Sequence, residues 1–282
     1  MKNTFLLLII FLSHAGLRAQ PYLDIVSVNY MHSPDAGIIN RNKQNHTLGY
    51  FNTSLNVPMP CKSIRGIVMV SPFYEEWNLS WTSTLNILAK HRNFALALSF
   101  VDTTMHHKWR YAVTPIIRMK DFSEDGTSSA QLGVAVLAIF SASRALTWKF
   151  GFYFNNDYFG NYFVPLLGFD WWINNRDKLF GILPGNMTFE HKINKLMYYG
   201  ITFNAITNSY RDQGHQYFRV DDNQLGIFGD VYFTKNIVLN TVIGNSLFRK
   251  LRTGEKNVFE NDLLVNDNFY IRLMLAYRIR FY

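Results

Sequence analysis

The stretch NFYIRLMLAYRIRFY, from Asn268 to Tyr282, carries the clearest structural signal in the chain. Successive side chains of a β-strand point to opposite faces, so alternate residues of this stretch share a face. Three arginines lie on one of these faces. The other face is wholly apolar and consists of Phe269, Ile271, Leu273, Leu275, Tyr277, Ile279 and Phe281. This division is typical of a transmembrane barrel, which has lipid outside and polar groups inside.

Four earlier segments repeat this alternation of large apolar residues with small or polar ones. They are Lys108 to Lys120, Thr147 to Asn155, Met197 to Asn204 and Gln224 to Phe233. If the apolar faces of all strands contact lipid, the interior gathers basic side chains. We expect the lumen to be lined by Lys108, Arg110, Arg118, Lys120, Lys149, Arg272, Arg278 and Arg280, with Asp170, Glu190 and Asp230 as acidic partners.

Turn signals divide the chain into short connections that alternate with longer polar ones. The longer set includes Tyr74 to Asn93, Asn208 to Asn223 and Leu251 to Asp267, which we expect to be external loops. The first of these could instead extend a strand or form a short helix. The sequence predicts an all-β fold, a single antiparallel outer-membrane barrel of about 12 to 14 strands with short periplasmic turns. The smaller number applies if Leu179 to Ile193 forms one strand rather than two joined at Pro184-Gly185 and if another weak segment is not a strand.

Closure of this barrel requires the first strand to pair with the last. Tyr22 to Tyr30 is the segment that we expect to pair with Asn268 to Tyr282, because lipid does not tolerate unpaired strand edges.

The first residues, MKNTFLLLIIFLSHAGLRAQ, read as a secretory signal. We expect cleavage after Ala19, which leaves residues 20–282 as one barrel domain.

Cys61 is the single cysteine, so a disulfide within the chain is excluded and a lipid anchor is not expected. No run of about 18 apolar residues follows the signal, which excludes a helical membrane protein. The net charge of +8 is scattered over an exported chain, so we expect no nucleic-acid partner.

The last strand resembles the C-terminal recognition strand of Gram-negative outer-membrane barrels, in which alternate apolar residues lead to a terminal aromatic. Here the apolar register ends at Phe281 and leaves Tyr282 one residue out of phase. The resemblance implies that this strand contacts the barrel-assembly machinery. It also implies that the mature chain lies among outer-membrane lipid and lipopolysaccharide.

The middle of the chain carries a set of short elements in a fixed order. They are Lys108-Trp109, Thr114-Pro115, Gly151-x-Tyr153, Pro165-Leu166-Leu167-Gly168-x-Asp170-Trp171, Ile173-Asn174 and Leu183-Pro184. In these elements the chain resembles a family of exported Bacteroidota outer-membrane β-barrel proteins known as a domain of unknown function (number 6268). The resemblance implies an outer-membrane barrel and no established activity, ligand or catalytic residue.

Two kinds of function are consistent with these residues. The first is a non-enzymatic barrel with a structural or surface-interaction role, whose interior is filled by paired charges. The second is a passive pore whose positive lining favours small polar or anionic solutes. The alternatives are a soluble secreted barrel that binds an apolar ligand and a lipid hydrolase at the barrel rim. His32-Ser33 and Ser141-x-Ser143 offer the residue types for a hydrolase without a motif that pairs them.

The sequence predicts no catalytic residue, no cofactor and no metal site. His106 and His107 are adjacent, so on a strand they would point to opposite faces, and no third ligand lies near them in the sequence.

Overall fold

The computed structural model describes residues 21–281 except 38–44, 62–65, 83–86, 103–107, 121–128, 212–215, 257 and 264. The predicted signal sequence (1–19), His106-His107 and Tyr282 therefore lie outside the described residues. The side chain of Lys120 also lies outside the described part of the structure. No helix in the described part of the chain is long and apolar enough to cross a membrane.

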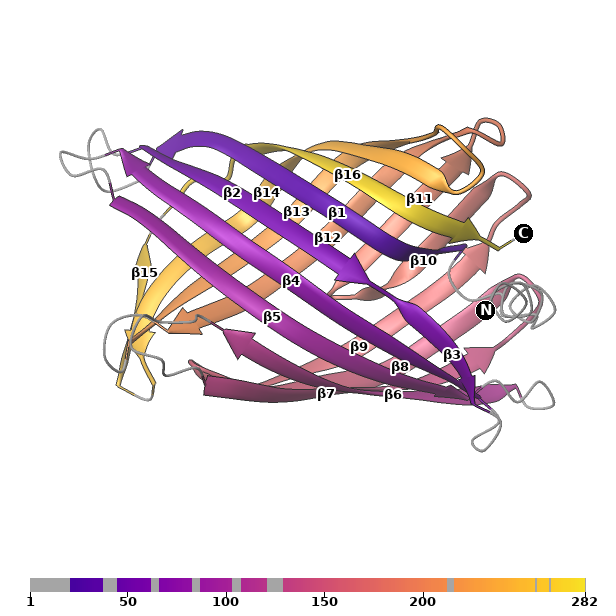
Figure 1. Ribbon diagram of the computed structural model, residues 1–282, viewed down its shortest axis with the longest axis horizontal. Helices are drawn as coiled ribbons and strands as arrows, with labels where there is room; N and C mark the ends of the chain where they lie inside the picture. Colours follow the sequence, from indigo (N-terminus) through magenta and orange to yellow (C-terminus); the bar gives the residue numbers. More distant parts are fainter. Residues whose placement is uncertain are drawn as a thin grey trace, which may run out of the picture.

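The described residues form β-strands joined by turns, all in one antiparallel sheet (Figure 1). The strands are β1 (Tyr22–Gly37), β2 (Asn45–Leu55), β3 (Val57–Cys61), β4 (Gly66–Thr82), β5 (Ile87–Asp102), β6 (Trp109–Lys120), β7 (Ser129–Ser141), β8 (Leu146–Asp157), β9 (Gly160–Trp172), β10 (Asp177–Leu183), β11 (Asn186–Lys192), β12 (Met197–Arg211), β13 (Gln216–Tyr232), β14 (Ile237–Glu255), β15 (Phe259–Leu263) and β16 (Phe269–Arg280). β2 and β3 share one position in the ring, interrupted at Asn56, and β15 and β16 share another. The barrel therefore has 14 strand positions, which confirms the predicted fold class.

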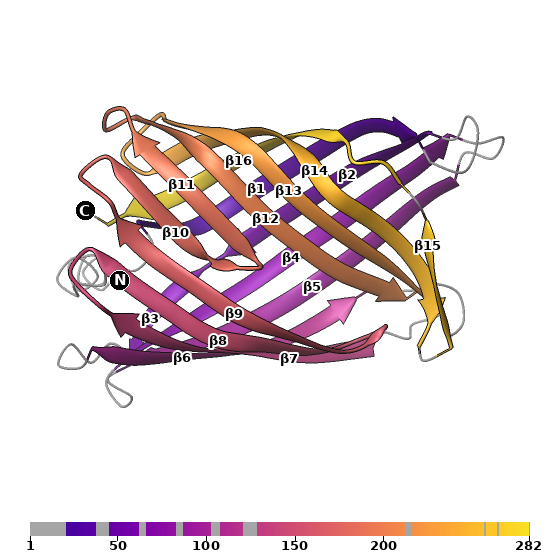
Figure 2. The same ribbon diagram turned by 180° about the vertical axis from the view of Figure 1, so that it is seen from behind.

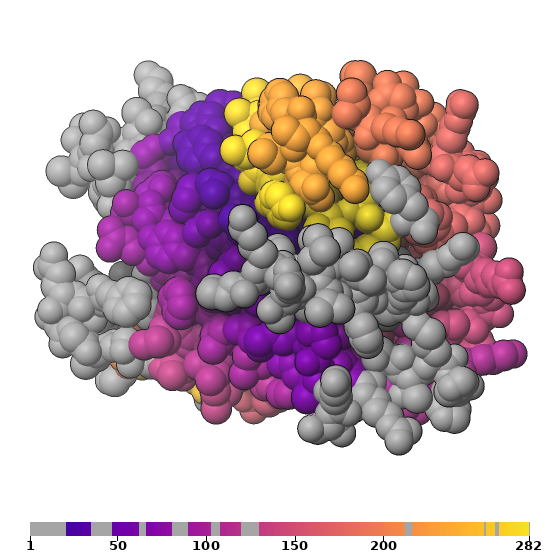
Figure 3. All heavy atoms as spheres, turned by 45° about the vertical axis from the view of Figure 1, so that its right-hand side comes forward, coloured from indigo at the N-terminus to yellow at the C-terminus, as the bar shows by residue number. Residues whose placement is uncertain are grey.

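The ring closes between β1 and β16. Their register runs from Tyr22 opposite Arg280 to His32 opposite Ile271, as the sequence predicts for the first and last strands. The space-filling view shows the indigo and yellow strands in contact (Figure 3). Closure pairs two edges that lipid would otherwise leave without hydrogen-bond partners.

β16 has the predicted alternation. The side chains of Phe269, Ile271, Leu273, Leu275 and Tyr277 are 41–52% exposed, whereas Tyr270, Ala276 and Arg278 between them are buried. Ile279 is half-buried, and Phe281 follows the end of the strand. The apolar faces of the sheet therefore point away from the interior. This orientation is opposite to the one that a soluble barrel with an internal apolar ligand requires.

The three long segments predicted as external loops are mostly strand, so that prediction is wrong. The alternative for Tyr74 to Asn93 is right, because β4 and β5 extend through most of it. Asn208 to Asn223 lies largely in β12 and β13, and Leu251 to Asp267 includes the end of β14 and all of β15.

Charge pairing explains why these segments form strands despite their polar composition. The carboxylate of Asp221 lies 3.0 Å from Arg219, and that of Asp262 lies 2.7 Å from Arg252. Polar residues that alternate along a strand and pair across neighbours are compatible with a sheet that continues beyond the lipid.

Leu179 to Ile193 forms two strands, which excludes the 12-strand alternative. β10 and β11 are joined by the predicted turn at Pro184-Gly185, and each has only 7 residues. Their neighbours are longer, with 13 residues in β9 and 15 in β12. β10 and β11, here called the short hairpin, therefore cover only part of the height of the wall (Figure 2).

Candidate functional site

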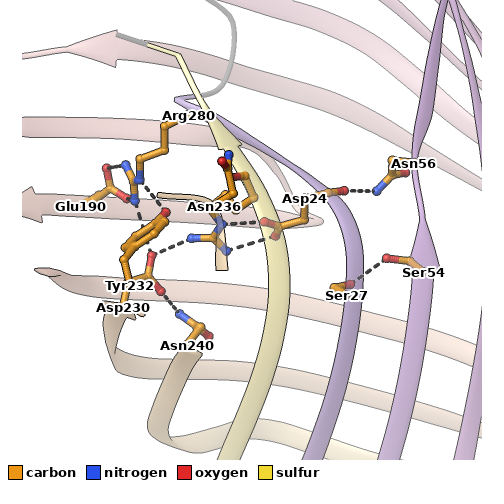
Figure 4. Close-up of polar contacts among 11 residues, drawn as sticks. Asp24, Ser27, Ser54, Asn56, Glu190, Asp230, Tyr232, Asn236, Asn240 and Arg280 are labelled. Atoms are coloured by element: carbon orange, nitrogen blue, oxygen red, sulfur yellow. Dashed lines mark hydrogen bonds and ion pairs between the residues drawn. The ribbon is translucent and has the colours of Figure 1, made fainter. Parts of the chain in front are cut away.

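Arginines and carboxylates form a buried cluster at the end of the barrel where β1 begins and β16 ends. We call Asp24, Glu190, Asp230, Arg278 and Arg280 the Arg280 cluster. Arg278 donates to Asp24 at 2.5 and 3.1 Å and to Asp230 at 2.6 Å. Arg280 donates to both oxygens of Glu190 at 2.9 and 2.7 Å (Figure 4). Bidentate contacts of this kind are the strong form of the arginine–carboxylate pair.

The Arg280 cluster reaches across the interior. Glu190 lies on β11 and Arg280 on β16, and three strands separate these positions in the ring. Tyrosine rings pack against both arginines: Arg278 lies 3.6 Å from the ring centre of Tyr22, and Arg280 lies 3.5 Å from that of Tyr198. Such cation–π contacts strengthen when water is excluded. These side chains form a set of contacts that crosses the lumen at this end, here called a partition.

A second partition lies toward the other end of the barrel, around the buried carboxylate of Glu75 on β4. Tyr50 donates to it at 2.9 Å, Asn93 at 2.8 Å and Asn208 at 2.9 Å. Asn208 belongs to β12, on the opposite wall, so this set of residues, the Glu75 cluster, also crosses the lumen. His91 adds a second crossing, because its ring stacks on those of Tyr210 and Phe218 with centres 5.0 Å apart.

Arg249 is a buried interior cation that the sequence did not indicate. It donates to Asp222 at 3.0 Å and to Ser33 at 3.0 Å. Its neighbour Phe248 has a positive φ of 56° and is 78% exposed, beside an irregular register between β13 and β14. Such a bulge reverses which residues face inward, and simple alternation does not predict it.

A cavity of about 210 Å³ adjoins the Arg280 cluster and is here called the central cavity. Its lining includes Asp24, Arg278, Arg272 and, from the short hairpin and β12, Asn186 and Asn204. This volume corresponds to roughly seven water molecules at about 30 Å³ each. The central cavity can therefore hold a small solute or the polar head of a larger one.

Two interior arginines, Arg272 and Arg118, have no acidic partner among the described residues. Arg272 lines the cavity, and no hydrogen bond or ion pair joins it to a described side chain. The buried Nε of Arg118 likewise has no hydrogen-bond partner in the described part of the chain. Tyr50 interacts electrostatically with both, which places them in the same region of the interior. Unpaired interior cations favour the binding of an anionic ligand, because a buried charge is costly without a counterion.

The other predicted lumen residues take varied positions. Lys149 is buried and lies 2.8 Å from Asp170. Arg110 is half-buried and donates to Ser141 at 3.3 Å. Lys108 is exposed at the residue before β6, so it is not one of the buried interior cations.

The serines considered for a hydrolase have structural contacts. Ser33 Oγ donates to the carbonyl oxygen of Phe269 at 2.9 Å and accepts from Arg249. Ser143 Oγ accepts two backbone N–H groups within its turn, those of Ala145 and Leu146, each at 3.1 Å. His32, adjacent to Ser33, is exposed whereas Ser33 is buried, so the two side chains lie on opposite faces of β1.

No family model matches the chain, and no curated protein matches it. Among solved structures, an outer membrane channel from Pseudomonas putida F1 is similar at 10% identity and a TM-score of 0.51, over 90% of this chain and 94% of the channel. The NanC porin is similar at 10% identity and a TM-score of 0.36, over 89% and 100%. The translocator domain of the autotransporter NalP from Neisseria meningitidis follows at 11% identity and a TM-score of 0.35, over 90% and 88%. The likeness to the first of these shows that the chain has the fold of an outer-membrane β-barrel.

Proposed function

We propose that this chain is an exported, non-enzymatic outer-membrane barrel that binds small anionic solutes in its lumen and lets them pass. The observation that carries the proposal is the pair of interior arginines, Arg118 and Arg272, without acidic partners among the described residues. Most other interior cations are already neutralised, as in the pairs of Lys149 with Asp170 and of Arg280 with Glu190. Of this uncompensated positive charge, the part on Arg272 lies at the central cavity.

The two partitions imply a barrel that is closed at rest. A solute that crosses the lumen has to displace side chains of both the Glu75 cluster and the Arg280 cluster. The contacts of Asn208 and Tyr210 with the opposite wall are hydrogen bonds and ring stacking, which separate more readily than the ion pairs of the Arg280 cluster. We therefore expect brief openings and a low mean conductance rather than the steady current of an open pore.

Ion selectivity of the refolded protein in planar bilayers tests the proposal. The reversal potential across a salt gradient should indicate anion preference, and Arg272→Gln should reduce that preference. Lys235→Gln removes the same charge from an exposed turn and should leave the selectivity unchanged. Cation-selective steps, or a selectivity that Arg272→Gln does not alter, would contradict the proposal, as would a folded barrel that stays silent.

A further inference from the structure

The short hairpin leaves a gap in the strand pairing of the barrel wall. β10 pairs with β9 only as far as Leu183 opposite Leu167, and β11 pairs with β12 only as far as Asn186 opposite Asn204. Residues 160–166 of β9 and 205–211 of β12, all of which the structure describes, continue past the hairpin and do not pair with each other. Two intervening strands hold β9 and β12 about 14 Å apart at the hairpin, at about 4.8 Å per strand spacing.

Contacts between the two sides close this gap at both of its ends. At its base, the N–H of Ala205 donates to the carbonyl oxygen of Gly185 in the hairpin turn at 2.8 Å. At its far end, Ser209 of β12 hydrogen-bonds to Asp157 at the end of β8. There Arg219 also lies 4.0 Å from the ring centre of Phe159. We call this gap the wall window; the view from behind shows β9 and β12 continuing past the end of the short hairpin (Figure 2).

The two edges of the wall window differ in polarity. Along the β9 edge, Leu167 at the base is 49% exposed and Phe163 is 63% exposed, and Leu183 at the end of the short hairpin is 40% exposed. Along the β12 edge, Thr207 donates to Asp221 at 2.9 Å, and Asp221 pairs with Arg219. Exposed apolar side chains suit the hydrocarbon, whereas charged pairs suit headgroup depth. The wall window therefore has one apolar edge and one polar edge.

Backbone chemistry restricts what can occupy the wall window. Roughly half of the N–H and C=O groups of an edge strand point away from its single neighbour, and hydrocarbon cannot satisfy them. Water or a polar headgroup has to supply their partners. Asn186 and Asn204, at the base, also line the central cavity, which Arg272 lines as well.

We propose that the wall window admits single-chain anionic amphiphiles, such as fatty carboxylates, from the membrane into the central cavity. The anionic head would lie against Arg272, and the chain would extend outward between Val164 and Ile206, which are half-buried apolar residues at the edges of the wall window. The inference rests on the proposed function, because it uses the same cavity and the same arginine. It adds to the proposed function the chemical class of the ligand and a lateral route by which the ligand enters from the membrane.

Photo-crosslinking tests this route. The probe is dodecanoic acid with a diazirine on its terminal carbon, added to the refolded protein in phosphatidylcholine vesicles and mapped by mass spectrometry. Labels should concentrate on the wall window, at Phe163, Leu183 and Ala205. Arg272→Gln should reduce them at least tenfold, because a charge-assisted contact is lost, and Arg272→Lys should retain most of them. Dodecanol with the same diazirine should label the wall window weakly.

Blocking the wall window provides a matched pair of variants. Ala205→Trp places an indole at its edge and should abolish labelling there, whereas Ile227→Trp adds the same ring to a lipid-facing position of β13 that is 66% exposed. Heat-modifiable gel migration shows that each variant is folded. Labels spread evenly over the apolar band, or window labels unchanged by Ala205→Trp and Arg272→Gln, would overturn the inference. Anion-selective conductance would then still support the proposed function, whereas window labelling without such conductance would refute the pore alone.

Discussion

Removal of the carboxylate of Asp230 should destabilise the barrel more than removal of any exposed carboxylate. The side chain of Asp230 is fully buried and accepts from Arg278 at 2.6 Å and from Asn240 at 2.7 Å. Breaking a buried ion pair by deleting one partner costs about 3–5 kcal/mol, because the remaining charge is left uncompensated. Arg278 keeps Asp24 at 2.5 Å, and Arg280 keeps Glu190 at 2.7 Å. We therefore expect Asp230→Ala to lose about 3 kcal/mol, at the lower end of that range.

The matched control is Asp262→Ala. Asp262 is 38% exposed and lies 2.7 Å from Arg252, so this pair is partly solvated. Its loss should cost less than about 1 kcal/mol. Urea unfolding of both variants in lipid vesicles, followed by tryptophan fluorescence, gives the two free energies of unfolding. Equal losses for Asp230→Ala and Asp262→Ala would refute the argument that the buried cluster holds this end of the barrel together.

Three further predictions concern the wall, the lipid face and the lumen. Gly244→Ala would place a Cβ 2.2 Å from a backbone oxygen, so we expect the free energy of unfolding to fall by about 1–3 kcal/mol in the same assay. The control is Gly229→Ala, whose Cβ meets no atom within 4 Å and which should be nearly neutral. Leu273→Arg puts a charge on the lipid face of β16 and should cost about 2–4 kcal/mol; an unchanged unfolding midpoint would argue against lipid contact there. Asn208→Ala removes a cross-lumen donor to Glu75 and should raise the mean conductance in planar bilayers, and an unaltered conductance would count against this partition.

Local alternation was sufficient to predict the wall of the barrel. Each residue of β16 from Phe269 to Tyr277 follows the two-residue period, because one face contacts lipid and the other does not. The pairing of Tyr22 to Tyr30 with the last strand also follows from a local rule, since a barrel must close. The length of the strands was harder to predict. Their polar ends contain charged pairs, such as Arg219 with Asp221, and therefore have the same composition as loops.

The interior depends on contacts that no local pattern contains. Glu75 and Asn208 are 133 residues apart in the chain and meet only because the barrel is narrow between β4 and β12. The bulge at Phe248 turns Arg249 inward, and a one-residue shift of this kind reverses every later assignment on the strand. The sequence did predict an interior rich in Arg272, Arg278 and Arg280. It did not predict which of these cations would lack a partner.

The polar groups at the end of the short hairpin have partners, and this distinguishes the wall window from an incomplete sheet. The N–H of Ile182 donates to the side-chain oxygen of Asn186 at 3.2 Å, and the carbonyl oxygen of Gly185 accepts from the N–H of Ala205 on β12. Pro184 has no N–H to satisfy. The end of the hairpin is therefore stable at a height where neighbouring strands continue and where lipid would penalise an unsatisfied group. The unpaired edges of β9 and β12 beyond the turn still need polar partners, and Asn186 belongs both to the turn and to the lining of the central cavity. For these two reasons we propose that the wall window and the cationic interior act as one site.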